Sequence, residues 1–214
     1  MSTSLSRMGA GFADPVHGAQ QTFRALLGAM SEPGRVLALP DAATAGLAPQ
    51  DADLRPPLGI ALAATLLTLL DADTPVHLAG ALDAGDTRAW LRFHTGTRAL
   101  PRATAMTAAL AGDVDAALWS ALDLGSDEAP QSGATLFVEV DALCEQPMDR
   151  AVALKLRGAG IARSRDLAVA GLSAAFWRWR AALRAELPRG VDVVLLCGRN
   201  IAAIPRSTHV ESEA

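Results

Sequence analysis

The sequence predicts an α/β fold, a three-layer sandwich in which a mixed sheet carries helices on both faces. Two observations predict it. Segments with apolar residues at helical spacing alternate with short apolar runs typical of strands. Near the C-terminus, two such runs are joined by the tight turn Gly198-Arg199-Asn200, which indicates an antiparallel hairpin. Helices alternating with strands, followed by a hairpin, favour a mixed sheet covered by helices.

The first predicted helix spans residues 15–31. Asp14 is a favourable N-cap and Pro15 suits the first helical position. Pro33 and Gly34 end the helix, because neither residue continues it readily. Six residues at helical spacing predict its buried face, namely Val16, Ala19, Phe23, Leu26, Leu27 and Met30.

The remaining elements follow from the same patterns. Residues 58–70 are apolar all round, which indicates a helix covered on most sides. Asp86 and Ser173 are predicted N-caps, and Gly96 is expected to close the helix that Asp86 begins. The later predicted helices are 58–70, 86–93, 114–122 and 173–187, and the predicted strands are 35–39, 74–79, 103–109, 135–140, 152–156, 191–197 and 201–204.

Length and composition predict one α/β domain, residues 14–214, behind a flexible segment at residues 1–13. The chain has 214 residues, and half of them are hydrophobic, which is enough for a substantial core. The loops at 40–57 and 123–133 are rich in Gly, Pro, Ser or Asp, but neither is long enough to require a second domain.

Charge and hydropathy exclude several classes of partner. The net charge is −4, which argues against a general nucleic-acid or anionic-membrane binder. The uncharged run 56–70 is shorter than the about 20 residues that a membrane span needs. The first residues lack the apolar segment of a secretory signal, and two cysteines make no disulfide framework. We therefore expect a cytoplasmic protein with no membrane or nucleic-acid partner.

Familiar catalytic and metal motifs are missing from the sequence. The two cysteines are 53 positions apart and the four histidines are scattered, so no metal site is expected. Neither a G-x-S-x-G elbow nor a G-x-x-x-x-G-K-[ST] phosphate loop occurs. A pyridoxal-phosphate enzyme needs a lysine, and the single lysine, Lys155, lies beside Arg157 on the less apolar face of a predicted strand. We expect Lys155 to be a surface residue.

Two polar clusters at predicted helix ends are candidate anion sites. Arg24 and Ser31 offer donors, with Glu32 placed to orient a neighbouring group. The alternative is a helix stop with a solvated face. Arg92 and His94 lie two residues apart beside Gly96 and suit a phosphate. The alternative is that His94 only caps the helix C-terminus.

Two further clusters follow predicted strands. The glycines of the segment 157–161 allow backbone amides to approach a phosphate, but Arg163 breaks the G-x-G-x-x-G spacing, so a tight turn without a ligand is favoured. Directly after the last strand come four potential donors, Arg206, Ser207, Thr208 and His209. We interpret them as anion-binding residues rather than a polar tail.

The predicted helix 173–187 carries a candidate interface. Trp177, Arg180 and Arg184 fall on the side away from its predicted buried stripe, which is Leu172, Ala175, Phe176, Trp179 and Leu183. An exposed Trp with Arg neighbours has the composition of an interface hot spot. The alternative is a Trp lying along the surface of its own chain.

Several short blocks, in this order along the chain, resemble the PhnH subunit family of the bacterial carbon–phosphorus lyase system. The blocks run from about residue 14 to residue 211, and each is weak alone. They are FRALL at 23–27, AMSEPG at 29–34, LLTLLDADTP at 66–75, LRFHT at 91–95, GATL at 133–136, GAGI at 158–161, GVD at 190–192 and AIPRSTHVE at 203–211.

The resemblance implies a subunit of the alpha-D-ribose 1-methylphosphonate 5-triphosphate synthase, working with PhnG, PhnI and PhnJ in phosphonate breakdown. In that transferase an alkylphosphonate displaces the purine of a nucleoside triphosphate. The resemblance also implies a pyridoxal-phosphate transferase fold without the cofactor, and a homodimer when the subunit is isolated. It supplies no catalytic residues.

Two main hypotheses follow for the molecular role. In one, five side chains from remote segments form one phosphonate- or nucleotide-binding pocket, namely Arg24, Arg92, His94, Arg206 and His209. In the other, the chain is a structural scaffold without a ligand site, and docks a partner through the Trp177–Arg184 face. A stand-alone pyridoxal-phosphate transferase is the least favoured alternative.

Overall fold

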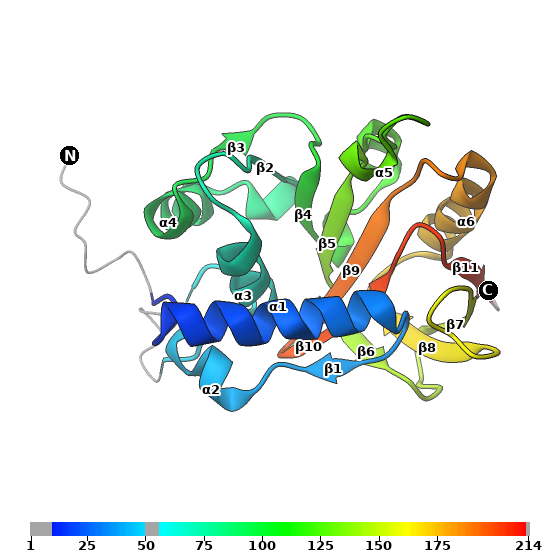
Figure 1. Ribbon diagram of the computed structural model, residues 1–214, viewed down its shortest axis with the longest axis horizontal. Helices are drawn as coiled ribbons and strands as arrows, with labels where there is room; N and C mark the ends of the chain where they lie inside the picture. Colours follow the sequence, from blue (N-terminus) through cyan, green and yellow to red (C-terminus); the bar gives the residue numbers. More distant parts are fainter. Residues whose placement is uncertain (1–9, 50–55, 213–214) are drawn as a thin grey trace.

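A computed structural model describes residues 10–49 and 56–212 of the chain. Its main feature is a mixed seven-stranded sheet with the strand order β1-β10-β9-β5-β4-β2-β3 (Figure 1). The strands are β1 (Leu37–Ala38), β2 (Val76–Leu78), β3 (Ala99–Leu100), β4 (Met106–Leu110), β5 (Thr135–Glu139), β9 (Asp192–Cys197) and β10 (Asn200–Ile204). Strands β3, β2, β4, β5 and β9 pair in parallel, whereas β9, β10 and β1 pair antiparallel. The predicted α/β class, mixed sheet and C-terminal hairpin are confirmed.

A second, antiparallel sheet packs beside the main one, and it was not predicted from the sequence. Its order is β11-β7-β8-β6. The strands are β6 (Ala142–Cys144), β7 (Val152–Arg157), β8 (Arg165–Ala170) and β11 (His209–Ser212). Only β7 was predicted. The interpretation of residues 206–209 as wholly a donor cluster is incomplete, because His209 begins β11 and the next residue of that strand, Val210, is buried.

Helices cover both faces of the main sheet. On one face lie α1 (Pro15–Ser31), α2 (Asp41–Thr44), α3 (Ile60–Leu69) and α4 (Gly85–Thr95), and on the other α5 (Ala116–Ala121) and α6 (Ala174–Ala182) (Figure 1). The second sheet shares the face of α5 and α6. The predicted helices on both faces are therefore present, but the layer on one face also contains four strands.

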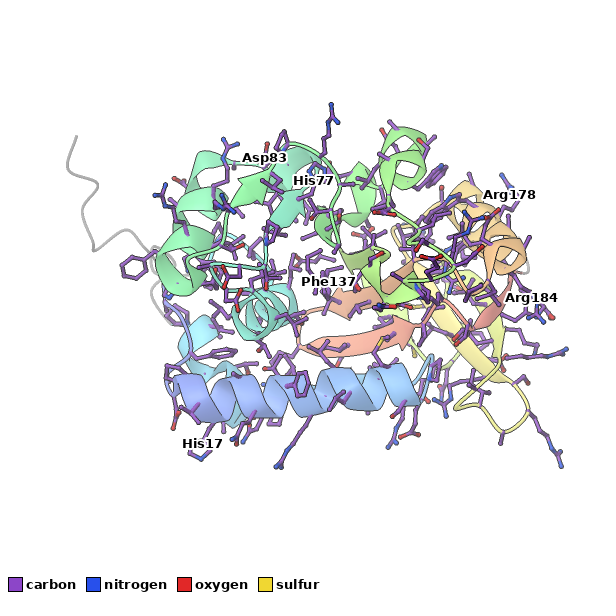
Figure 2. All side chains as sticks on the ribbon, turned by 45° about the horizontal axis from the view of Figure 1, so that its top comes forward. His17, His77, Asp83, Phe137, Arg178 and Arg184 are labelled. Carbon is purple, nitrogen blue, oxygen red and sulfur yellow. The ribbon has the colours of Figure 1, made fainter. Side chains whose placement is uncertain are left out.

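Successive side chains of the central strands point to opposite faces of the sheet, so the hydrophobic core has two parts. Phe137 of β5 and Val194 of β9 pack with α1, α3 and α4, and Phe137 is seen between the sheet and this helix layer in Figure 2. Their neighbours Leu136 and Val193 face the opposite way, toward α6 and the second sheet. This period of two is what an extended strand covered on both faces requires.

The caps of α1 are as predicted, but its buried face is not. The Asp14 carboxylate accepts from the backbone N–H groups of Val16 and His17, both at 3.1 Å. The buried residues of α1 are Gly18, Thr22, Leu26 and Ala29. The prediction that Val16, Phe23 and Leu27 are buried is wrong, because α1 packs through small residues, which let its backbone approach the layer beneath.

Other boundaries differ locally. The expected loop 40–57 contains α2 and a following 3-10 turn, Ala45–Leu47. Helix α4 begins one residue before Asp86 and shows no side-chain cap, but Gly96 closes it in the left-handed conformation, as predicted. Of the segment 1–13, residues 1–9 lie outside the described residues, and the Ala10 carbonyl accepts a bond from Trp90 Nε1 at 3.2 Å. Among the described residues, no helix has the length and hydropathy needed to cross a membrane.

Candidate functional site

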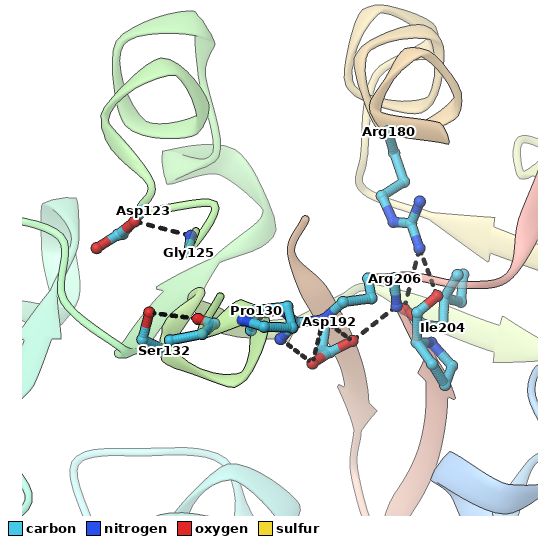
Figure 3. A network of polar contacts seen from close by, with 10 residues as sticks. Asp123, Gly125, Pro130, Ser132, Arg180, Asp192, Ile204 and Arg206 are labelled. Atoms are coloured by element: carbon cyan, nitrogen blue, oxygen red, sulfur yellow. Dashed lines mark hydrogen bonds and ion pairs between the residues drawn. The ribbon is translucent and has the colours of Figure 1, made fainter. Parts of the chain in front are cut away.

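Arg206 is the centre of a polar network between the end of β10 and the start of β9. Its Nε lies 3.2 Å from each Asp192 oxygen, and its Nη2 donates to Asp192 Oδ2 at 2.6 Å (Figure 3). Its Nη1 donates to the Pro130 carbonyl. Both side chains of the Arg206–Asp192 pair are about 15 % exposed. This bidentate pair therefore joins β9, β10 and the 130–132 turn.

Arg180 of α6 lies in the same network. It is 1 % exposed, and its Nη2 donates to the Pro205 carbonyl at 2.6 Å and to the Ile204 carbonyl at 3.4 Å (Figure 3). Burial lowers the pKa of Arg180 to about 10; Asp192 opposes the shift and Arg206 adds to it. The Arg180 guanidinium stays charged at neutral pH, so two buried or nearly buried cations lie near one carboxylate, which pairs with Arg206.

The predicted interface on α6 needs correction. Trp177 is 0 % exposed and Arg180 is buried, so neither faces a partner. Arg184 is exposed, and Figure 2 shows it projecting from the α6 end of the molecule. The predicted stripe is also buried in part, including Phe176 and Leu183. Helix α6 is enclosed on more of its circumference than a single apolar stripe suggests.

Three of the predicted clusters meet at one place. A Cβ added at Gly160 would lie 2.1 Å from the Ser31 carbonyl, and one at Gly158 would lie 3.3 Å from the Ser207 carbonyl. The turn between β7 and β8 therefore lies against both the end of α1 and the segment after β10. Its glycines serve close backbone packing.

The polar residues of this meeting point are largely engaged with one another. Glu32 pairs with Arg35 at 2.6 Å, and Arg165 donates to the Glu32 carbonyl at 2.9 Å. Ser31 Oγ donates to the Gly28 carbonyl at 3.0 Å. The Arg165 bond holds the end of α1 against β8, and the other two bonds are local to the end of the helix.

The residues that follow Arg206 differ from one another in exposure. Ser207 is exposed, Thr208 is 3 % exposed, and His209 lies 3.5 Å from Glu211. The hydroxyl of Thr208 has no hydrogen-bond partner among the described residues. Its backbone N–H donates to the Pro205 carbonyl, which Arg180 also binds.

The remaining predicted anion-binding residues lie elsewhere. Arg24 is exposed on α1, and Arg92 lines a shallow hollow on α4 with Arg88, Ala89 and Phe93. His94 packs against Trp90, with ring centroids 4.8 Å apart. Helix α4 lies beside β2 and β3, at one end of the sheet (Figure 1), whereas Arg206 follows β10, which is near the opposite end of the strand order. The five side chains of the pocket hypothesis do not converge.

Two hollows are near polar residues. One, of about 460 Å³, is lined by Arg206 and Ser207 together with Pro130, Gln131, Leu187, Pro188 and Asp192. The other, of about 770 Å³, lies over β2 beside α5, near His77 and Asp83 in Figure 2. The second hollow was missed by sequence reasoning, because its lining comes from several short segments with no common motif.

The hollow over β2 is acidic and internally bonded. His77 Nδ1 donates to the Leu100 carbonyl at 3.0 Å, and Asp113 accepts from the Ala81 N–H at 3.0 Å. Asp115 caps α5 and Asp83 pairs with Arg88. Three carboxylates against one lining arginine, Arg102, do not suit an anion. Among the described residues, no group of three or more metal-ligating side chains is present.

At the carboxyl edge of β5, Glu139 faces the start of α3. Its carboxylate accepts from the Gly59 N–H at 3.2 Å. Burial raises the pKa of Glu139, and this hydrogen bond partly opposes the shift. The position that often binds ligands in α/β proteins is therefore closed by a carboxylate and a helix terminus.

A surface of the opposite character lies along α1. Val16 is 64 %, Phe23 46 % and Leu27 53 % exposed, and all three are large apolar residues. Fold and site together thus define a mixed α/β protein with buried arginine side chains and an exposed apolar helix face.

The chain belongs to the PhnH family. The family model described as "Bacterial phosphonate metabolism protein (PhnH)" matches residues 10–211, so the family predicted from the short sequence blocks is confirmed. A Rhizobium meliloti (strain 1021) protein named "Alpha-D-ribose 1-methylphosphonate 5-triphosphate synthase subunit PhnH" is 37 % identical over 209 residues, 94 % of each chain. A Stutzerimonas stutzeri protein named "Putative C-P lyase subunit protein HtxG" is 32 % identical over 195 residues, which cover 89 % of this chain and 85 % of the relative.

Proposed function

We propose that this chain is an assembly subunit of an alpha-D-ribose 1-methylphosphonate 5-triphosphate synthase, acting in phosphonate catabolism in the cytoplasm. The observation that carries the proposal is the 37 % identity over 94 % of both chains to a protein named as such a subunit. The partners would be PhnG, PhnI and PhnJ, and the transferase reaction would belong to the complex. No group of this chain is assigned to the chemical step.

The engagement of the polar clusters supports a structural rather than a catalytic contribution. Arg206 already binds Asp192 and the Pro130 carbonyl, and Glu32 already binds Arg35. Lys155 pairs with Asp166 at 3.1 Å on the second sheet. The residues present do not fit a pyridoxal-phosphate site, since a Schiff base needs an available lysine. The five parallel strands followed by an antiparallel strand support a transferase-like fold that lacks this site.

Co-expression with PhnG, PhnI and PhnJ of the same organism tests this proposal. A tag on PhnI should recover the chain in a fixed ratio, which native mass spectrometry measures. Recovery of the other three subunits without this chain would contradict the proposal.

A second candidate function is anion binding at the 460 Å³ hollow. It is favoured by one observation: Arg206 pairs with the Asp192 carboxylate that lines this hollow, and the charge of Arg180 lies close enough to interact electrostatically with both, so the two arginines outnumber that carboxylate. Arg206 and Ser207 would then contact a phosphonate or triphosphate. Calorimetric titration of the assembled complex with methylphosphonate and with ATP tests it, using Ser207→Ala. Unchanged affinity for both ligands would contradict this role.

A further inference from the structure

The exposed apolar residues of α1 form one row. With 3.6 residues per turn, Val16, Phe23 and Leu27 fall within an arc of roughly 40° and span about 16 Å along the axis. In Figure 1, α1 lies across the front of the molecule, and no other helix or strand is drawn over its outer side. The spacing i, i+7, i+11 is that of helix residues which anchor in a partner's groove.

The row does not serve the fold of this chain. Helix α1 reaches the core through Gly18, Thr22, Leu26 and Ala29. Small residues on this inner side allow close approach, and a Cβ at Gly28 would lie 2.9 Å from Leu37 Cδ1. Three large apolar side chains of the helix, Val16, Phe23 and Leu27, are thus about half or more exposed to water. Contiguous apolar surface of this kind marks an interaction site.

The charge beside the row indicates what kind of partner fits. Arg24 lies next to Phe23, is exposed, and makes no ion pair among the described residues. Helix α1 carries no acidic residue between Pro15 and Ser31, and His17 is bonded to Asp14 at 2.7 Å. The face is therefore apolar with one unpaired cation, on a chain whose net charge is −4.

A second copy of this chain fits the face poorly. Arg24 lies one residue from the midpoint of α1, so a two-fold antiparallel pairing about that midpoint brings two Arg24 side chains together. The face offers no carboxylate to neutralise them, and like charges at close range oppose association. A different chain with an acidic residue at the corresponding position has no such penalty.

We infer that the Val16–Phe23–Leu27 row with Arg24 is the surface by which this chain docks to another subunit of its complex, into an apolar groove that carries a carboxylate for Arg24. The inference rests on the proposed function and specifies the surface through which that function is performed.

The test compares two phenylalanines of similar exposure in the co-expressed complex. Phe23 is 46 % exposed in the row, and Phe93 is 53 % exposed on α4. With tagged PhnI, Phe23→Ser should lower recovery of this chain about tenfold or more, as expected for an interface hot spot. Phe93→Ser should leave recovery unchanged. Arg24→Glu should lower recovery, and Arg24→Lys should restore most of it.

The other possible outcomes contradict the proposed function, the docking surface or the kind of partner, and they can be distinguished. If wild-type chain is not recovered, the proposed function fails before the surface is tested. If wild-type and Phe23→Ser chains are recovered equally, or Phe93→Ser is lost equally, the docking surface is wrong and the subunit role stands. If Phe23→Ser instead converts an isolated dimer to a monomer while assembly persists, the row joins two copies and the inference is overturned. Circular dichroism of each variant verifies folding.

Discussion

In most proteins, charged side chains are exposed and large apolar side chains are buried. Two regions of this molecule depart from that rule in opposite ways: the network between α6 and the end of β10, and the outer face of α1. At the first, Arg180 is 1 % exposed and binds two backbone carbonyls, and Arg206 is fixed by Asp192. At the second, Phe23 and Leu27 are about half exposed. The Arg180 guanidinium donates to carbonyls at the end of β10, and Arg206 pairs with Asp192. The outer apolar groups of α1, by contrast, remain about half exposed in this chain. The comparison indicates that the arginines maintain the fold and the apolar row serves a partner.

The substitution with the largest expected effect tests whether the buried Arg180 maintains the fold. Arg180→Ala removes the donor to the Ile204 and Pro205 carbonyls and leaves a cavity beside α6. We expect the free energy of unfolding to fall by about 3–5 kcal/mol. Urea denaturation measures it, with the exposed Arg184→Ala as control, which should change stability by less than about 0.5 kcal/mol. Equal effects of the two substitutions would show that Arg180 is not a structural cation.

The next largest effect on stability is expected at the turn between β7 and β8, where three of the predicted polar clusters meet. Gly160 has a φ of +79°, and a Cβ there would lie 2.1 Å from the Ser31 carbonyl. Gly160→Ala should destabilise the fold by about 1–3 kcal/mol through backbone strain alone, with the collision adding to it. Gly85→Ala is the matched control, because nothing lies within 4 Å of its added Cβ. A melting temperature as high for Gly160→Ala as for Gly85→Ala would refute the close packing of this turn.

A smaller effect is expected on the outer face of α1. Phe23→Ser should lower the free energy of unfolding of the isolated chain by only about 1 kcal/mol, because the residue is 46 % exposed and loses only part of the burial of a core phenylalanine. Phe176→Ala, at a fully buried ring, should cost about 3–5 kcal/mol. Urea denaturation of the two variants compares them directly. A large loss from Phe23→Ser would mean that the row contributes to the fold after all.

The smallest expected effect is a pH dependence of the free energy of unfolding that arises from Glu139. This carboxyl group is half-buried, between the buried arginines and the exposed apolar row. Burial raises its pKa in the folded state, so the ionised carboxylate costs stability above that pKa. As the pH falls through it, the folded state takes up the proton first, and the contribution of Glu139 to stability improves. The wild type should therefore gain stability relative to Glu139→Gln as the pH is lowered from neutral toward the ordinary pKa of a glutamate. A difference that stays constant with pH would contradict this.

The sequence was sufficient for the elements with local signals. Asp14 and Pro15 marked the start of α1, Ser173 capped α6, and the hairpin at Gly198 was visible in the residue pattern. Strand β8 was missed because its start, Arg165-Asp166, is charged and only Leu167, Ala168 and Val169 are buried. Strand β11 was missed because three of its four residues stay partly exposed.

The site was less predictable, because it depends on packing between remote segments. For α1, counting large apolar residues selected the wrong face, since close packing there uses Gly18 and Ala29. For α6, aromatic residues surround the helix, so no single stripe distinguished buried Trp177 from an exposed one. Nothing in the local sequence reveals that Arg206 is paired with Asp192, fourteen residues away. The family, by contrast, was correctly identified, because its blocks extend along nearly the whole chain.

Oxidative footprinting of Phe23 in the free chain and in the assembled complex tests the central claim most directly. Hydroxyl radicals modify exposed aromatic rings, and mass spectrometry of the peptides gives the rate at each residue. We predict that assembly slows the oxidation of Phe23 and Leu27 several-fold and leaves that of Phe93 unchanged. Equal oxidation of Phe23 in the free and assembled chain would contradict docking through α1.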